Sequence, residues 1–220
     1  MNEEVLDLIM VELELQGLND EIYRYHLACG LTVVYYIPDY EKLKEGVFEP
    51  IYMKEEDLEE MNLTEKEMFE RVYWNTVMIS QPEILLFTDY MKELIPKCDD
   101  ERMKKILYIL SENLSTKCDD EKLWCITNSF REKGAFAGIF IPLLRKFCMV
   151  HGKKKVLLGF ANNDFVFMYA DSVETENVIF FLTYELHHIL KEADEIAKCM
   201  ILQYDYEMNI LTKCSENGSI

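Results

Sequence analysis

The sequence VLLGFANNDFVFMY, residues 156–169, places two apolar runs on either side of a short turn. Both runs are rich in branched and aromatic residues, which favour strands. The turn contains Asn162, Asn163 and Asp164, whose short polar side chains tolerate left-handed backbone conformations. The stretch therefore predicts an antiparallel β-hairpin.

The residues around this hairpin predict a regular series of elements in the second half of the chain. Residues 123–127 (LWCIT) favour a strand, and residues 135–150 favour a helix. A second helix is expected from Ser172 or Thr175 to Leu190, followed by residues 199–206 and 208–212 as paired strands or one bent strand. The order β-α-β-β-α-β with short loops implies helices packed on one face of a mainly antiparallel sheet. The expected fold class is α+β.

The first half predicts an acidic, largely helical region with fewer strands. Strands are expected over residues 31–37 and 48–53, and helices over 3–15 and from Pro82 to Glu93. Residues 54–61 are expected to form a short acidic helix or a turn. Thr64 and Glu67 have the spacing of a capping box, which predicts a further helix start at this point.

Charge divides the chain unevenly. The 220 residues carry 41 acidic and 23 basic side chains, and residues 1–121 hold 29 of these acids with 12 of the bases. We therefore distinguish an acidic mixed region over residues 1–121, a compact α+β region over 122–214 and a disordered tail over 215–220. The first two are expected to form one continuous domain, because the length suits a single core or a core with a small subdomain.

The net charge of −18 argues against direct nucleic-acid binding, which takes its affinity from Lys and Arg. The acidic N-terminus differs from a signal peptide, and the most apolar stretch, residues 138–150, is too short to span a bilayer. Seven cysteines without a C-x-x-C pair suggest reduced thiols, with Cys125, Cys148 and Cys199 buried. A cytoplasmic location without membrane contact is expected.

Two groups of residues carry a resemblance. Residues 123–128 (LWCITN), 134–139 (GAFAGI) and 142–144 (PLL) combine an apolar strand that ends in Thr-Asn with a helix start of small residues, and upstream PIY at 50–52 and LTEKE at 63–67 form a first motif. This pattern resembles a family of uncharacterised bacterial proteins, a domain of unknown function found in Gram-positive gut bacteria and their mobile elements. The resemblance covers residues 30 to 212 and implies fold and context but no activity. Family members often carry Pro-Ser-Ser and a His-Glu pair at the hairpin turn, where this chain has GFANND at 159–164.

An enzyme is not expected, and no catalytic residue, metal or cofactor is predicted. A cysteine nucleophile needs a nearby histidine, and none of the four histidines (His26, His151, His187 and His188) lies in a local signature. The repeated pentapeptide KCDDE at 97–101 and 117–121 brings cysteines beside acids, but zinc sites favour closely spaced Cys and His pairs. Any role for Cys98 and Cys118 stays open.

The acidic run from Glu55 to Glu60 is the predicted partner-binding face, and it comprises Glu55, Glu56, Asp57, Glu59 and Glu60. On a helix, residues four apart lie about 6 Å apart along the axis, close to the spacing of neighbouring phosphates on a nucleic-acid strand. The simpler interpretation is an ordinary solvated helix face, because like charges at this spacing repel only weakly.

The leading hypothesis is a non-catalytic protein-binding module that acts through this acidic surface. One alternative is a nucleic-acid-mimicking inhibitor of a DNA- or RNA-binding enzyme, of the anti-restriction or anti-CRISPR type, and the second is a cysteine-dependent enzyme. The expected partner is a protein, with a basic nucleic-acid-binding channel in the mimicry case. The identity of the partner and the oligomeric state are left open.

Overall fold

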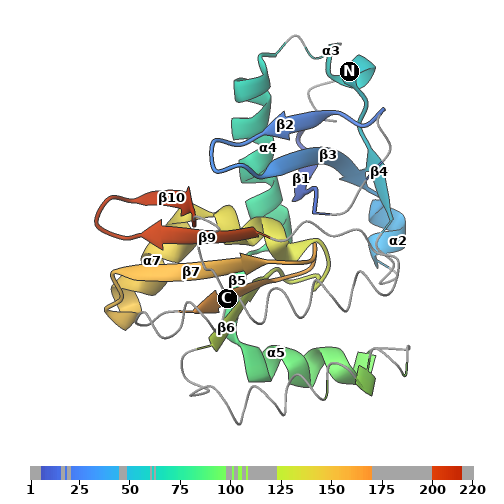
Figure 1. The fold of residues 1–220 in the computed structure, drawn as a ribbon. Helices are drawn as coiled ribbons and strands as arrows, with labels where there is room; N and C mark the ends of the chain where they lie inside the picture. The colour runs from blue at the N-terminus through green and yellow to red at the C-terminus, as the bar shows by residue number, and fades with distance from the viewer. Residues whose placement is uncertain are drawn as a thin grey trace.

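Two antiparallel sheets organise the molecule (Figure 1). The computed structural model describes residues 6–15, 18, 21–44, 49–59, 61, 63–97, 101, 104, 105, 108, 123–169 and 200–214. The strands are β1 Met10–Leu13, β2 Arg24–His26, β3 Thr32–Pro38, β4 Pro50–Tyr52, β5 Glu83–Leu86, β6 Leu123–Thr127, β7 Lys155–Phe160, β8 Val166–Tyr169, β9 Met200–Asp205 and β10 Ile210–Lys213. The helices are α2 Tyr40–Lys44, α3 Glu55–Glu59, α4 Glu65–Ser80, α5 Phe87–Leu94 and α7 Ile141–His151, with 3₁₀ segments η1 Ile95–Lys97 and η2 Gly134–Ile139. The α+β class is confirmed.

The six-stranded sheet has the order β10-β9-β7-β8-β6-β5, and every pairing is antiparallel. The predicted hairpin is β7 and β8, with Phe160 opposite Val166. Its turn is fixed by Asn162, whose side-chain oxygen accepts hydrogen bonds from the backbone N–H groups of Asp164 and Phe165. Asn162 therefore shapes the turn through its side chain, but Asn162, Asn163 and Asp164 do not adopt the left-handed backbone conformation that their residue types suggested.

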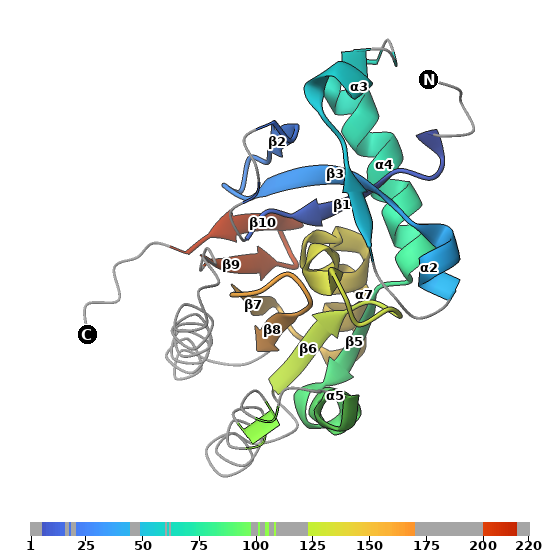
Figure 2. The same ribbon diagram turned by 90° about the vertical axis from the view of Figure 1, so that its right-hand side faces the viewer.

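Helices cover both faces of this sheet, where one face was expected. Alternate residues of each strand point to opposite sides, so Ile126 packs with Leu144 and Phe147 of α7, whereas Cys125 packs with Phe87 of α5. Figure 2 shows α7 and α5 on either side of the sheet. The second helix expected in the C-terminal half and the tail over residues 215–220 lie outside the described residues.

The four-stranded sheet is built around β3. β1 pairs with one edge of β3, while β2 and β4 pair in succession with the other edge. Helix α4 packs against β1, and the hydroxyl of Thr76 accepts a hydrogen bond from the N–H of Val11. The capping box predicted for α4 is confirmed, because Thr64 and Glu67 bond each other's backbone N–H groups.

The helix predicted over residues 3–15 is wrong for residues 10–13, which form β1. All four residues of β1 are buried, so its sequence lacks the alternation of a half-exposed strand. The helix expected from Pro82 begins only at Phe87. Residues 83–86 form β5 and pair with β6 instead.

The helix predicted over residues 135–150 is divided into η2 and α7. Gly134 begins η2 in close contact with the hairpin turn, because a Cβ atom there would lie 2.5 Å from both the carbonyl oxygen of Asp164 and the hydroxyl of Thr127. Only glycine fits this approach without displacing backbone.

One apolar cluster joins the two sheets. It contains Val33 and Val72 from the acidic region together with Phe136, Leu158 and Leu202 from the second region, so the core crosses the boundary at residue 121. Among the described residues, no helix combines the length and apolar character that crossing a membrane requires.

Candidate functional site

The acidic residues predicted as a binding face line a surface hollow beside α3. Glu55 and Glu56 are exposed at the start of α3 and, together with Glu21 and Lys54, surround a hollow of about 370 Å³. Asp57 has a different role, because its Oδ2 accepts the backbone N–H of Lys54 at 2.9 Å and thereby closes the first turn of α3. The side chain of Glu59 and the whole of Glu60 lie outside the described residues, and so do the two rows of carboxylates that the spacing predicts.

The hollow carries an excess of negative charge. Lys54 Nζ lies 2.6 Å from Glu21 Oε2, and this hydrogen bond lowers the pKa of Glu21 and raises the pKa of Lys54. Among the residues that the structure describes, no Lys or Arg forms an ion pair with Glu55 or Glu56. Three carboxylates therefore face one ammonium group. Within the described part of the chain Glu55 and Glu56 form no ion pair, although the charge of Glu56 acts on Lys54.

Tyr23 extends this acidic group to helix α4. Its hydroxyl donates a hydrogen bond of 2.8 Å to Glu65 Oε1 in the first turn of α4. Burial raises the pKa of Tyr23, and the negative charges of Glu65 and Glu55 raise it further, so both carboxylates act on the same phenol. We call Glu21, Glu55, Glu56 and Glu65 the acidic surface.

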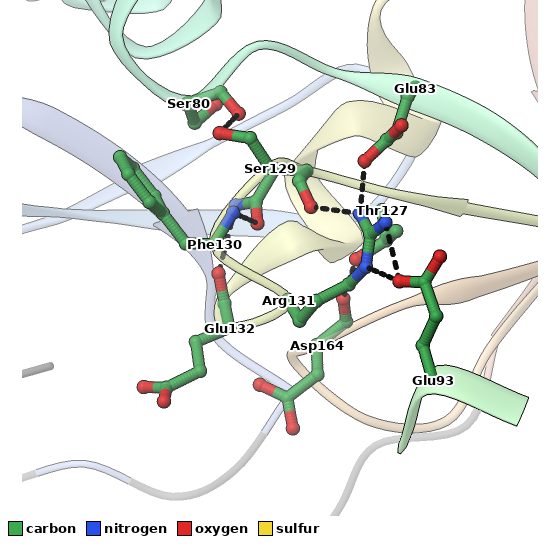
Figure 3. Close-up of polar contacts among 10 residues, drawn as sticks. Ser80, Glu83, Glu93, Thr127, Ser129, Phe130, Arg131, Glu132 and Asp164 are labelled. Atoms are coloured by element: carbon green, nitrogen blue, oxygen red, sulfur yellow. Dashed lines mark hydrogen bonds and ion pairs between the residues drawn. The ribbon is translucent and has the colours of Figure 1, made fainter. Parts of the chain in front are cut away.

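A second polar cluster surrounds Arg131, in the loop between β6 and η2 (Figure 3). The guanidinium donates hydrogen bonds to Glu83 of β5, to Glu93 Oε2 of α5 at 2.8 and 3.0 Å, and to the carbonyl of Asn128 at 2.7 Å. Burial alone would lower the pKa of Arg131, but the bonds to Glu83 and Glu93 outweigh it and raise that pKa. Arg131 has a left-handed φ of 64°, which these contacts hold in place. The cluster therefore fixes the loop, and sequence analysis missed it because its members are far apart in the chain.

The third cluster is buried where the two sheets meet. Glu12 of β1 is fully buried, accepts a hydrogen bond of 2.8 Å from the hydroxyl of Tyr52 and lies 3.2 Å from Lys133 Nζ. Burial raises the pKa of Glu12, and the Lys133 ammonium and the Tyr52 hydroxyl oppose this shift. The sequence feature that could have indicated this cluster is the charged Glu12 inside the otherwise apolar run MVEL at 10–13.

Two of the four described cysteines, Cys125 and Cys148, have the surroundings of structural thiols. Cys125 and Cys148 are buried as predicted, and burial raises the pKa of Cys148 to about 11 and that of Cys125 well above its ordinary value. Thiols of this kind are protonated near neutral pH and are weak nucleophiles. The described histidines make other contacts, His26 with Thr32 and His151 with the Phe147 ring.

Within the described part of the chain, no group of His, Cys, Asp and Glu side chains is arranged to hold a metal ion. Cys98, Cys118, Cys199, His187 and His188 lie outside it.

No family model, curated protein or solved structure matches this chain. The resemblance to an uncharacterised bacterial family stays a prediction, and the function is argued from the site alone.

Proposed function

We propose that the protein is a non-catalytic binding module that docks a basic protein on its acidic surface. The observation that carries this proposal is the hollow lined by Glu21, Lys54, Glu55 and Glu56, in which three carboxylates meet one ammonium group. Surface charge of one sign attracts an oppositely charged partner and speeds its encounter. The whole chain reinforces this local field with its net charge of −18.

The rest of the structure supports binding over catalysis. Arg131 and Glu12, charged groups of the kind that active sites use, are paired within the protein by Glu83, Glu93 and Lys133. The two buried thiols favour their protonated form, which argues against either of them as a nucleophile.

Imitation of a nucleic acid is the narrower form of the same proposal. A mimic needs carboxylates in rows that match successive phosphates. The predicted rows include Glu59 and Glu60, whose side chains lie outside the described residues, and the described hollow has Lys54 among its carboxylates. The general form, a docking surface for a basic protein, therefore has the better support.

The test compares two triple variants with the same change in net charge. Glu55→Gln/Glu56→Gln/Glu65→Gln neutralises three of the four acids of the acidic surface, and Asp89→Asn/Glu101→Gln/Glu207→Gln neutralises three exposed acids elsewhere. The probe is a fluorescent arginine-rich peptide, titrated with protein at about 50 and about 300 mM salt. We expect the first variant to bind about tenfold more weakly at low salt and the control to bind within about twofold of the native chain, because local complementarity exceeds the general field. Equal losses in both variants would overturn the proposal.

A further inference from the structure

The hydroxyl of Tyr35 is buried next to the acidic surface without a hydrogen-bond partner. Tyr35 belongs to β3, and its side chain is fully buried. Within the described part of the chain, no donor or acceptor bonds its hydroxyl oxygen. An unsatisfied buried hydroxyl costs stability, so a group of this kind needs an explanation, and a ligand that supplies the missing partner is one.

The side chain of Tyr35 points toward the first turn of α4. Its ring stacks on the ring of Tyr23, with centroids 5.6 Å apart and planes inclined by 29°, and the Tyr23 hydroxyl reaches Glu65 Oε1 at 2.8 Å. Burial raises the pKa of Tyr35. The nearby Tyr23 and Glu65 raise that pKa further, which places the Tyr35 hydroxyl near the same carboxylate. The unpartnered hydroxyl therefore faces the acidic surface from the inside of the protein.

The charge beside these two tyrosines is negative. Glu55 from α3 and Glu65 from α4 both raise the pKa of Tyr23 by their charge, so the two carboxylates lie on either side of one phenol. The neighbouring lysines, Lys54 and Lys66, form their ion pairs with other acids. Among the described residues, neither Glu55 nor Glu65 is balanced by an ion pair of its own.

The chain itself shows how groups of this kind hold an arginine. The guanidinium of Arg131 bonds two carboxylates from different elements, Glu83 of β5 and Glu93 of α5, and its Cζ lies 6.0 Å from the centre of the Tyr90 ring. A guanidinium is planar, presents five N–H donors and stacks on aromatic rings, whereas the ammonium of lysine is a compact charge. Two carboxylates on separate elements beside a tyrosine ring also occur at the acidic surface.

We propose that the acidic surface binds an arginine side chain of the basic partner, with its guanidinium between Glu55 and Glu65 and against the ring of Tyr23. This inference rests on the proposed function and names the residue type that the partner contributes. The guanidinium replaces the Tyr23 hydroxyl at Glu65. The half-buried Tyr23 side chain shifts to admit it, and this shift opens the Tyr35 hydroxyl to one of the N–H donors.

The unpartnered hydroxyl selects arginine over other organic cations. A lysine ammonium carries its three donors on one atom, so it does not bond two carboxylates and Tyr35 while also stacking on a ring. A quaternary ammonium group stacks on aromatic rings but has no N–H to donate to the hydroxyl. Only the guanidinium satisfies the carboxylates, the ring and the hydroxyl together.

The test compares two fluorescent peptides that differ only in the type of base. Both have about 12 residues, with the same number of arginines in one as of lysines in the other, and each is titrated with the full chain at about 50 mM salt. Binding is followed by fluorescence anisotropy. We expect the arginine peptide to bind about tenfold more tightly, because the charges are equal and only the guanidinium makes the additional contacts. Equal affinities would overturn the proposal.

Tyr35→Phe separates a binding role of the hydroxyl from a structural one. The change removes an oxygen that has no partner, so the urea midpoint should stay at the native value or rise. Affinity for the arginine peptide should fall about fivefold, and affinity for the lysine peptide should stay within about twofold. The matched control is Tyr90→Phe, since Tyr90 is equally buried and its hydroxyl also lacks a partner. The control should bind both peptides like the native chain.

A second variant tests the ring. Tyr23→Leu removes the aromatic face and should weaken binding of the arginine peptide about tenfold. If this change also disturbs the stacked ring of Tyr35, Tyr35→Phe keeps the test decisive. A lower urea midpoint for Tyr35→Phe would show that its hydroxyl already has a partner inside the protein. An equal loss of affinity for both peptides would show that the hydroxyl does not distinguish the bases. Either result would overturn the arginine site.

The two proposals fail in different ways. If Glu55→Gln/Glu56→Gln/Glu65→Gln weakens both peptides equally while Tyr35→Phe changes neither, the arginine site is overturned and the acidic surface stands. If this triple variant and its charge-matched control lose the same affinity, the acidic surface is overturned and the arginine site with it. A triple variant that keeps the native preference for arginine would place the guanidinium elsewhere on the protein and would overturn the arginine site.

Discussion

The buried carboxylate of Glu12 contacts both Lys133 and Tyr52. A fully buried carboxylate is costly unless its charge is balanced, and Lys133 supplies that balance from 121 residues away in the sequence. Lys133 is itself 19% exposed, so its ammonium keeps some contact with water. The pair therefore joins β1 of one sheet to the loop after β6 of the other.

Replacing Lys133 with Met should destabilise the fold, and more so at high pH. Burial raises the pKa of Glu12 above its ordinary 4.5, so the folded chain binds its proton more readily than the unfolded chain does. The free energy of unfolding therefore falls as pH rises through this interval, and loss of Lys133 raises the pKa of Glu12 further. We expect a loss of about 3 kcal/mol at about pH 8 and a smaller loss at about pH 5, measured by urea denaturation.

The control for this variant is Lys146→Met, which removes an exposed lysine of α7 and changes the net charge equally. Its effect should be within about 0.5 kcal/mol at both pH values. A loss from Lys133→Met that is the same at both pH values would contradict a charged Glu12 as its cause.

The sequence predicted correctly those helices and turns whose structure depends on hydrogen bonds between residues close together in the chain. The β7–β8 hairpin and the start of α4 depend on neighbouring residues, Asn162 and Thr64, whose hydrogen bonds stay within three residues of the chain. β1 was mistaken for a helix because it is buried on both faces, and its acid, Glu12, is balanced by a distant lysine that no local pattern reveals.

The candidate site, too, was predictable only where its residues are close together in the sequence. Glu55 and Glu56 were predicted from the sequence because exposed acids on a short helix need no distant partner. The hollow was not, since Glu21 comes from a separate segment, which the Ile22–Lys54 bridge and the Glu21–Lys54 pair bring to α3.

The capping box of α4 offers a test of the element itself. Thr64→Ala removes the hydroxyl that accepts the N–H of Glu67 and should lower the free energy of unfolding by about 1 kcal/mol. Thr64→Ser keeps the hydroxyl and should stay within about 0.5 kcal/mol of the native chain. Thermal and urea denaturation measure both variants, and equal losses would show that the methyl group, and not the cap, matters.

For the whole molecule, the decisive feature is a core shared by two sheets. Side chains of β3 and α4 meet those of η2, β7 and β9 in one cluster, and Asn163 of the hairpin turn accepts the N–H of Leu15 at 3.4 Å across the junction. The acidic region is therefore packed on the second region, and its strand β5 is part of the six-stranded sheet. A docking surface with ordered side chains needs such support, because mobile side chains lose entropy when a partner binds.

This shared core predicts that the two regions unfold together. Trp74 reports on α4, and Trp124 reports on β6, where it packs 5.1 Å from the Phe147 ring. In Trp124→Phe and Trp74→Phe each remaining tryptophan is observed alone during urea denaturation, alongside far-ultraviolet circular dichroism of the same sample. We expect the fluorescence and dichroism midpoints to coincide within each variant, since separating the regions exposes apolar surface on both. If Trp74 fluorescence changes at a lower urea concentration than the dichroism, the acidic region unfolds by itself, and its surface is a separate unit that the second region does not hold rigid.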